Sequence, residues 1–141
     1  MSRFTADIVP TPTAIAQATE DAADFLQGAG VDARAIHHVS LVIEELLTNV
    51  ASHGGNTESP ATVILDVLPD RIAGEIGDCG KPFDPRTGPA VDVAAAPEDR
   101  RIGGLGLHLV RQLTSALDYR SDGQQNWTTF CIRRGGKEGI E

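Results

Sequence analysis

The sequence predicts a two-layer α/β (α+β) sandwich, with helices on one face of a mixed, mostly antiparallel sheet. The first observation is the order of the segments, which runs strand, helix, helix, strand, strand, helix, strand, strand. The second is that neighbouring strand-like runs are joined by short turns at Pro69-Asp70 and Asp122-Gly123, as in antiparallel hairpins. The length of 141 residues and the hydrophobic content of 40% suit one domain with its own core.

The first half of the chain predicts one strand and two helices. Residues 4–9 alternate loosely and stop at prolines, so they form a candidate edge strand. Residues 13–28 place apolar side chains at helical spacing before a glycine-rich stop. The longest helical pattern follows at residues 36–54, where apolar residues recur at steps of three and four. Asp32 is its candidate N-cap, and the Gly54-Gly55 pair is its expected end.

The second half predicts two hairpins separated by a long loop and a helix. Strand-like runs occupy residues 61–68, 71–76, 117–120 and 127–133. Residues 81–102 show no clear periodicity and contain scattered prolines, which is typical of a lid or a binding segment. An apolar helix begins at residues 103–106, directly after this loop.

Composition limits the class of protein. The formal net charge of −8 argues against nucleic acid as a partner, since no basic stripe offsets it. No apolar run approaches the roughly 20 residues that span a bilayer, and the first residues lack a signal-peptide core, so we expect no membrane partner. Cys79 and Cys131 are the only cysteines and form no CxxC pair, so we expect both thiols to be reduced. We therefore expect a cytoplasmic protein with a single domain over residues 1–141, a core at about 4–133 and a tail at 134–141.

Glu45 and Asn49 lie four residues apart in the long helical pattern, so they share one helix face beside the apolar stripe. A carboxylate and an amide at the edge of a core can serve as a proton acceptor and as an oxygen ligand for a hard cation. The alternative is a solvated helix flank. Asn49 counts against that alternative, because asparagine is a poor helix former in a helix interior. Glu44 points to another side of the helix and is expected at the surface.

Asp78-Cys79-Gly80 follows a strand-like run and has two interpretations. Taken alone, the motif is best explained as a turn closed by the aspartate side chain. The functional interpretation is an aspartate that accepts a hydrogen bond from the amino group of a nucleobase, with Gly80 leaving room for the ring.

The run GGLG at residues 103–106 is the clearest local signal for phosphate. Glycines let a backbone approach a ligand closely, and the free N–H groups at a helix start attract anions. The same run can be only a flexible hinge or a tight turn. It is not a P-loop, because no GK[ST] follows, and it is not a Rossmann fingerprint, because a loop and not a strand precedes it.

In their order and spacing, Glu45-x-x-x-Asn49, the run Asp78-x-Gly80-x-PFDP at residues 78–85 and GGLGL at residues 103–107 resemble the N, G1 and G2 boxes of the GHKL (Bergerat-fold) ATPase superfamily. The His53-Gly54 ending of the long helix and the PFDP run resemble the anti-sigma-factor serine kinases in particular. The resemblance extends from the first strand to about Arg133 and implies the Bergerat ATP-binding fold.

The resemblance also implies roles for single residues. Asn49 would ligate Mg²⁺ between the ATP phosphates, and Glu45 would act as general base on the acceptor hydroxyl. Asp78 would hold the adenine amino group beside Gly80, and Thr128 would support that aspartate. The lid residues expected to close over the phosphates are Gly103, Gly104, Leu105 and Gly106. Two further lid residues, Arg100 and Arg101, are either phosphate ligands or solvated loop charges.

The function that the resemblance implies is an ATP-dependent serine/threonine protein kinase that acts as an anti-sigma regulatory factor. It would phosphorylate a STAS-domain anti-sigma antagonist and, as a homodimer, sequester a sigma factor. Two alternatives stay open: a nucleotide-gated protein-binding regulator without phosphotransfer, and a regulator with a non-sigma target. Glu45 favours the enzyme, because a pure binding module requires no base. The catalytic domain of a histidine kinase is disfavoured, since no dimerisation helix with a phospho-acceptor histidine precedes the domain.

Overall fold

The computed structural model describes residues 2–53, 59–86 and 104–135 of the chain. Several predicted features lie outside these ranges: the Gly54-Gly55 helix end, most of the 81–102 loop, Gly103, and the tail from residue 136 onward. No helix of the described residues has both the length and the hydrophobicity of a membrane-spanning segment.

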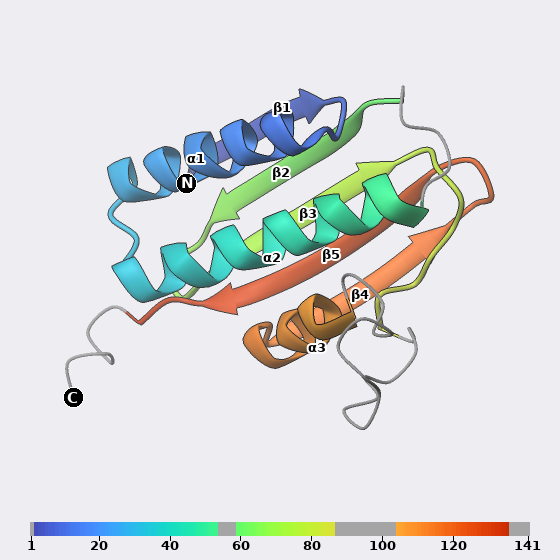
Figure 1. Cartoon of the computed structure of the whole chain (residues 1–141). Helices are drawn as coiled ribbons and strands as arrows, with labels where there is room; N and C mark the ends of the chain where they lie inside the picture. Colours follow the sequence, from blue (N-terminus) through green and yellow to red (C-terminus); the bar gives the residue numbers. More distant parts are fainter. Residues whose placement is uncertain (1, 54–58, 87–103, 136–141) are drawn as a thin grey trace.

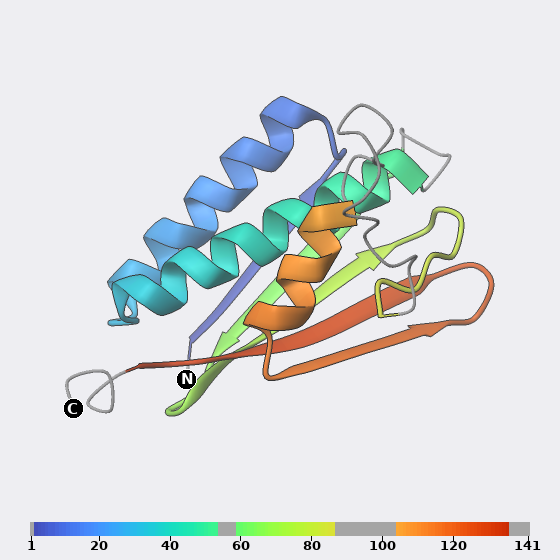
Figure 2. The ribbon, with the colours of Figure 1, turned by 60° about the horizontal axis from the view of Figure 1, so that its bottom comes forward.

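Five strands of the described chain form one sheet in the order β1-β2-β3-β5-β4, and every neighbouring pair is antiparallel (Figure 1). The strands are β1 (Ser2–Ile8), β2 (Ala61–Val67), β3 (Arg71–Asp78), β4 (Ala116–Ser121) and β5 (Asn126–Arg133). The three helices of the described residues lie on one face of this sheet, and no described helix covers the other face (Figure 2). They are α1 (Pro12–Gly28), α2 (Ala33–His53) and α3 (Gly104–Leu113). The predicted α/β sandwich and the predicted order of elements are confirmed.

Side-chain caps begin both long helices. The Thr11 hydroxyl accepts a hydrogen bond from the Ala14 N–H at 3.1 Å and caps α1. Asp32 caps α2 as predicted, since its Oδ2 accepts from the Ala35 N–H at 3.1 Å. Between the helices Gly30 has φ of +81°, a left-handed conformation that favours glycine after a helix end.

The core lies between α2 and the middle strands. Helix α2 packs between α1 and α3 and contacts β3 and β5 (Figure 1). Its predicted apolar stripe faces the core: Val39, Ile43 and Leu47 are fully buried, and Ile36 and Val50 are partly buried. Val42, which the stripe did not include, is fully buried as well. The strands present alternate residues to this stripe, as the two-residue period of a strand requires. The polar residues Glu45 and Asn49 therefore lie in the C-terminal half of α2, at the edge of the core.

The predicted strand boundaries hold to within a few residues, and the main difference concerns β3. The sequence predicts a strand that ends at Ile76, whereas β3 continues through Gly77 to Asp78. Gly77 pairs with Trp127 of β5, and the indole ring covers the space that a side chain at Gly77 would fill. The glycine is thus part of the strand, and the strand carries Asp78 to its end.

The C-terminal end of β5 is tied to the start of α2. The Gly135 N–H donates to Asp32 Oδ1 at 2.9 Å, while the other oxygen of the same carboxylate caps the helix. The Arg134 guanidinium donates to the Leu68 carbonyl at 2.9 Å and to the Gly30 carbonyl at 3.3 Å. These contacts lie at the end of the sheet where Ser2 pairs with Val67, opposite the end that holds Asp78 and Asn126.

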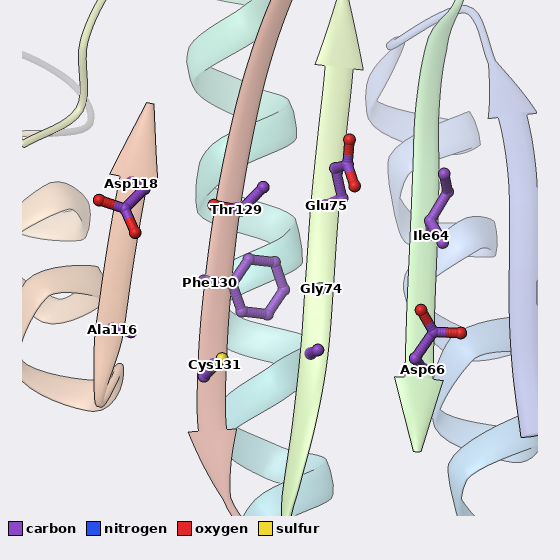
Figure 3. A pocket seen from close by; sticks show the side chains of 10 residues that line it. Ile64, Asp66, Gly74, Glu75, Ala116, Asp118, Thr129, Phe130 and Cys131 are labelled. Carbon is purple, nitrogen blue, oxygen red and sulfur yellow. The ribbon is translucent and has the colours of Figure 1, made fainter. Parts of the chain in front are cut away.

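Gly74 and Phe130 form a cross-strand pair that fills the core beside α2. The two residues are direct partners in β3 and β5, and the Phe130 ring extends over Gly74 (Figure 3). A Cβ atom at Gly74 would overlap several atoms of the ring, and Phe130 is only 2% exposed. The absence of a side chain at Gly74 is therefore a condition for burying the ring.

We predict that Gly74→Ala lowers the free energy of unfolding by about 1–3 kcal/mol, because the methyl group overpacks a closed core. Equilibrium urea denaturation measures this. Gly28→Ala is the matched control, since a side chain at Gly28 meets open space; it should be neutral or stabilising by up to about 1 kcal/mol. In a Phe130→Leu background the penalty of Gly74→Ala should shrink. An unchanged stability of Gly74→Ala in the wild-type background would contradict the packing argument.

Candidate active site

A narrow hollow lies between α2 and the adjoining ends of β3, β5 and β4, on the helix-covered side of the sheet. Three residues predicted for the site line it: Asn49 from α2, Asp78 from β3 and Thr128 from β5. Its apolar walls come from Leu46, Val50 and Ile76. The fold thus brings together three residues that are far apart in the sequence, and it surrounds them with apolar surface suited to a flat ring.

Asn49 is a buried polar residue on the wall of this hollow. It is 8% exposed, and among the described residues its side-chain amide makes no hydrogen bond. Leaving a buried amide unpaired costs about 1–3 kcal/mol, so most proteins avoid it. A solvated helix flank, the alternative interpretation from the sequence, does not describe a residue this buried. The amide is instead placed to meet a polar ligand in the hollow.

Asp78 closes the predicted turn and lines the hollow at the same time. Its Oδ2 accepts a hydrogen bond from the Gly80 N–H at 2.9 Å, as an aspartate turn requires. The same oxygen accepts from Asn126 Nδ2 at 3.2 Å. Asp78 Oδ1 accepts no hydrogen bond from the described residues. The turn interpretation and the functional interpretation of Asp78 are therefore compatible.

Asn126 supports the candidate site from outside the hollow, and the sequence did not reveal it. It is 2% exposed, and its amide contacts both Asp78 and the Gly80 carbonyl, the latter at 2.9 Å. Asn126 opens β5 directly after a turn, where asparagine is common for local reasons. Its relation to Asp78 comes from the sheet, because Asn126 is the cross-strand partner of Asp78 and only the register of β3 and β5 shows this.

Glu45 lies one helical turn before Asn49, under the beginning of α3. Glu45 is half-buried, whereas Glu44 is exposed, as predicted. A Cβ atom at Gly106 would overlap the Glu45 carboxylate, so α3 passes close to this group only because residue 106 is glycine. Partial burial, and to a lesser extent the neighbouring Glu44, raises the pKa of Glu45 above its ordinary value of 4.5.

The predicted glycine run is described in part. Gly104, Leu105 and Gly106 form the first turn of α3, and Gly103 lies outside the described residues. Of Leu105 only the backbone is described. The first N–H groups of a helix have no partner within the helix, so the start of α3 is suited to an anion. The lid residues Arg100 and Arg101 also lie outside the described ranges.

The first part of the loop after β3 is fastened to the sheet and to α3. The Phe83 N–H donates to the Tyr119 hydroxyl at 3.2 Å. The Arg111 guanidinium donates to the Pro85 carbonyl from two nitrogens, at 3.0 and 2.9 Å. Lys81, Phe83, Pro85 and Tyr119 also line the hollow, and none of them was predicted from the sequence as a site residue. The beginning of the predicted lid therefore forms one wall of the site.

A second hollow, of about 170 Å³, lies on the uncovered face of the sheet (Figure 3). Three carboxylates border it, and each has an arginine partner: Arg3–Asp66 at 2.7 Å, Arg120–Glu75 at 3.9 Å and Arg86–Asp118 at 3.7 Å. None of the described residues that were predicted for the site lines this hollow. Because its charges are already matched, we do not place the reaction there.

Comparison with known proteins agrees with the predicted family. The family described as "Histidine kinase-like ATPase domain" matches residues 8–132. The chain is 32% identical over 93 residues to the serine/threonine-protein kinase BtrW of Bordetella bronchiseptica, which covers 64% of this chain and 66% of BtrW. It is 34% identical over 92 residues to the serine-protein kinase RsbW of Listeria monocytogenes, which covers 60% of this chain and 58% of RsbW. The chain thus spans less than two thirds of the length of these curated relatives, 66% of BtrW and 58% of RsbW.

A solved structure agrees with the fold. The chain is similar to the crystal structure of the RsbU and RsbW domains of Rv1364c from Mycobacterium tuberculosis, with a TM-score of 0.70 over 95% of this chain and 33% of that chain. The sequence identity is 15%, so the likeness concerns the fold alone. Since the family match extends over nearly the whole sandwich, the chain belongs to the family of histidine kinase-like ATPase domains, the GHKL type that its three short boxes predict.

Proposed function

We propose that this chain is an ATP-dependent serine/threonine protein kinase that acts as an anti-sigma regulatory factor. The observation that carries the proposal is the buried amide of Asn49, which has no hydrogen-bond partner among the described residues and lies in the same hollow as Asp78, with Glu45 one helical turn away. The relatives named as serine or serine/threonine kinases support phosphotransfer. The resemblance of the boxes to anti-sigma-factor kinases supports the regulatory role.

Adenine is expected to bind in the hollow against Leu46, Val50 and Ile76. Asp78 Oδ1 would accept a hydrogen bond from the exocyclic amino group, with Gly80 beside the ring and Thr128 on the opposite wall. The hollow measures about 20 Å³, so a purine ring enters only when side chains of the loop after β3 move aside. Lys81 and Phe83 are half-exposed or exposed and belong to that loop.

The phosphates are expected to extend from the hollow toward the start of α3. There Gly103, Gly104 and Gly106 would let the backbone N–H groups approach the phosphate oxygens. The N–H of Leu105 would belong to the same set of donors. This places the transferred phosphate near Glu45, because Gly106 lies against the Glu45 carboxylate.

Asn49 fits the role of a Mg²⁺ ligand. Its carboxamide oxygen is a hard donor of the kind that Mg²⁺ takes, and the buried amide has no partner among the described residues. When bound, the ion would neutralise charge on the phosphates, which phosphoryl transfer needs more than covalent help.

Glu45 is proposed as the general base. Its raised pKa makes the carboxylate a better proton acceptor than an exposed glutamate. Glu45 would take the proton from the acceptor hydroxyl while the hydroxyl oxygen forms a bond to the γ-phosphorus. The bond from that phosphorus to the β–γ bridging oxygen breaks, and ADP leaves.

The partners proposed are a STAS-domain anti-sigma antagonist as phosphate acceptor and a sigma factor as the sequestered target, with the kinase as a homodimer. Incubation with labelled ATP and candidate STAS proteins tests the first partner. Transfer to a serine or threonine of a STAS protein supports the kinase. Tight nucleotide-dependent complexes without transfer would instead favour a nucleotide-gated binding module.

We predict that Asp78→Ala and Asn49→Ala each weaken binding of ATP·Mg²⁺ by about 10- to 100-fold, as expected for a lost contact to a charged group. Isothermal titration calorimetry measures this, with and without Mg²⁺. Asn49→Ala should abolish the gain in affinity from Mg²⁺ while leaving the unliganded protein as stable as wild type or about 1 kcal/mol more stable. Asp70→Ala, an exposed aspartate in the β2–β3 turn, is the control. Wild-type affinity in both site variants would overturn the pocket.

We predict that Glu45→Gln lowers the rate of phosphotransfer by about 10²–10⁴-fold and leaves ATP affinity unchanged. In wild type the rate should fall as the pH drops through the pKa of Glu45, because only the ionised carboxylate accepts a proton. That pKa lies above 4.5, so the acidic limb should lie above the range of an exposed glutamate. Glu44→Gln removes a neighbouring negative charge and should move the limb to lower pH. An acidic limb in wild type that lies no higher than the range of an exposed glutamate would contradict the assignment.

We predict that Gly106→Ala impairs transfer far more than it impairs folding. The methyl group would meet the far end of the flexible Glu45 side chain, which can turn aside, so the free energy of unfolding should change by no more than about 1 kcal/mol. Displacing the base should still lower the rate by at least about tenfold. Rapid-quench kinetics and urea denaturation provide the two measurements, with Gly28→Ala as control. Full activity of Gly106→Ala would show that the close contact between α3 and Glu45 plays no part in the reaction.

A further inference from the structure

We propose that Asn126 is a positioning residue that turns one oxygen of Asp78 toward the nucleobase. This inference rests on the nucleotide site proposed above, and it assigns a role to a residue outside the three boxes. Asn126 contacts Asp78 and the Gly80 carbonyl but does not line the hollow, so it acts through the aspartate.

The Asn126 amide uses all of its hydrogen-bonding capacity in one orientation. Its Nδ2 donates to Asp78 Oδ2 at 3.2 Å and to the Gly80 carbonyl at 2.9 Å. Its Oδ1 accepts from the Ser121 hydroxyl at 2.6 Å and from the Tyr119 hydroxyl at 3.3 Å. A flipped amide would set its carbonyl oxygen against two other acceptors, so the chemistry of the neighbours fixes which side faces Asp78.

This contact leaves the two oxygens of Asp78 unequal. Oδ2 receives two N–H donors, one from Gly80 and one from Asn126. Oδ1 receives none from the described residues, and Asp78 lines the hollow. A carboxylate held by one oxygen cannot rotate freely, so the other oxygen stays available as an acceptor. Without Asn126, the Gly80 N–H alone would hold the Asp78 carboxylate through one hydrogen bond, about which the carboxylate can rotate.

The Asn126 side chain is itself held by the β4–β5 hairpin. Ser121 and Tyr119 both lie on β4, and Asn126 opens β5. The Tyr119 hydroxyl also accepts from the Phe83 N–H in the loop after β3. The acceptor side of the Asn126 amide thus has two hydroxyl donors, so the loss of one leaves the amide oriented by the other.

The decisive variant is Asn126→Asp, which keeps the shape and the acceptor side of the amide. It replaces the donor that faces Asp78 by a carboxylate oxygen. At about pH 8 both carboxylates are ionised and repel each other, whereas at about pH 5 they share one proton that restores a donor between them. Affinity for ATP should be at least about tenfold below wild type at the higher pH and return to within about threefold at the lower pH.

Calorimetry should report the ratio of variant to wild-type affinity at each pH, because the ratio cancels the titration of the nucleotide phosphates. Among the described residues, the charged or titratable groups that contact Asn126 or line the hollow are Asp78 on β3, Tyr119 on β4 and Lys81 in the loop. Helix α2 lines the hollow with Leu46, Asn49 and Val50, none of which carries a charge. Asp78 and the introduced aspartate form the one pair of adjacent carboxylates among these groups. A recovery at low pH therefore reports the pair of carboxylates.

Ser121→Ala is the matched control. It removes a hydroxyl from the other side of the same amide and leaves both donors to Asp78 and Gly80 in place. It should destabilise the hairpin but keep ATP affinity within about threefold of wild type at every pH. If Asn126→Asp does not fold, Asn126→Ala replaces it: affinity should fall at least about fivefold, with no recovery at low pH.

An affinity ratio near one for Asn126→Asp at all pH values would overturn the positioning role, and so would an equal loss in Ser121→Ala. These outcomes differ from a failure of the site itself. If wild type does not bind ATP, or if Asp78→Ala binds it as wild type does, the nucleotide pocket is wrong and the role of Asn126 is wrong with it. If Asp78→Ala loses affinity and Asn126→Asp does not, only the role of Asn126 is overturned.

Discussion

The packing of α2 against β3 and β5 determines where every part of the site lies. The apolar stripe of the helix must be buried, and the middle of the sheet is the surface that buries it. With the stripe fixed, Glu45 and Asn49 have one possible place, at the edge of the core and next to the ends of β3 and β5. The polar residues of the site are thus positioned by hydrophobic contacts that they do not take part in.

Whereas hydrophobic packing fixes α2, hydrogen bonds hold the other groups of the candidate site. Asp78 is fastened by a turn and by Asn126, and the loop after β3 is fastened through Tyr119 and Arg111. Apart from the turn, each of these contacts joins segments that are distant in the sequence. A rigid wall on α2 and a wall of hydrogen-bonded loops face each other across the hollow, so a ligand that enters it changes the second wall more easily than the first.

Most of the fold could be predicted from the sequence, because local patterns specify it. Periodicity placed the helices and strands, and the cap at Asp32 was found from its residue type alone. The end of β3 was placed too early, since the glycine at 77 signals a break unless the ring of Trp127 is known to cover it. Information about a partner strand is not contained in the strand itself.

The candidate site also contains some residues that the sequence predicts and others that only the three-dimensional arrangement reveals. Glu45 and Asn49 were predicted as site residues because their spacing places them on one helix face, whereas Asp78, which alone is best explained as a turn, was predicted through the resemblance of the three boxes. Asn126 was not found, because its importance comes from the register that sets it opposite Asp78. The closeness of Gly106 and Glu45 also depends on how two helices cross, which no short motif encodes.

The fastening of Gly135 to Asp32 has a practical consequence for how the domain can be joined to others. The first and last described residues, Ser2 and Gly135, lie at the end of the sheet remote from Asp78 and Asn126 (Figure 1). A fluorescent protein, an affinity tag or a second domain linked at either terminus would therefore emerge far from the hollow. Fusions at both termini are compatible with an unobstructed site, whereas an insertion in the β4–β5 hairpin would disturb the contacts of Asn126.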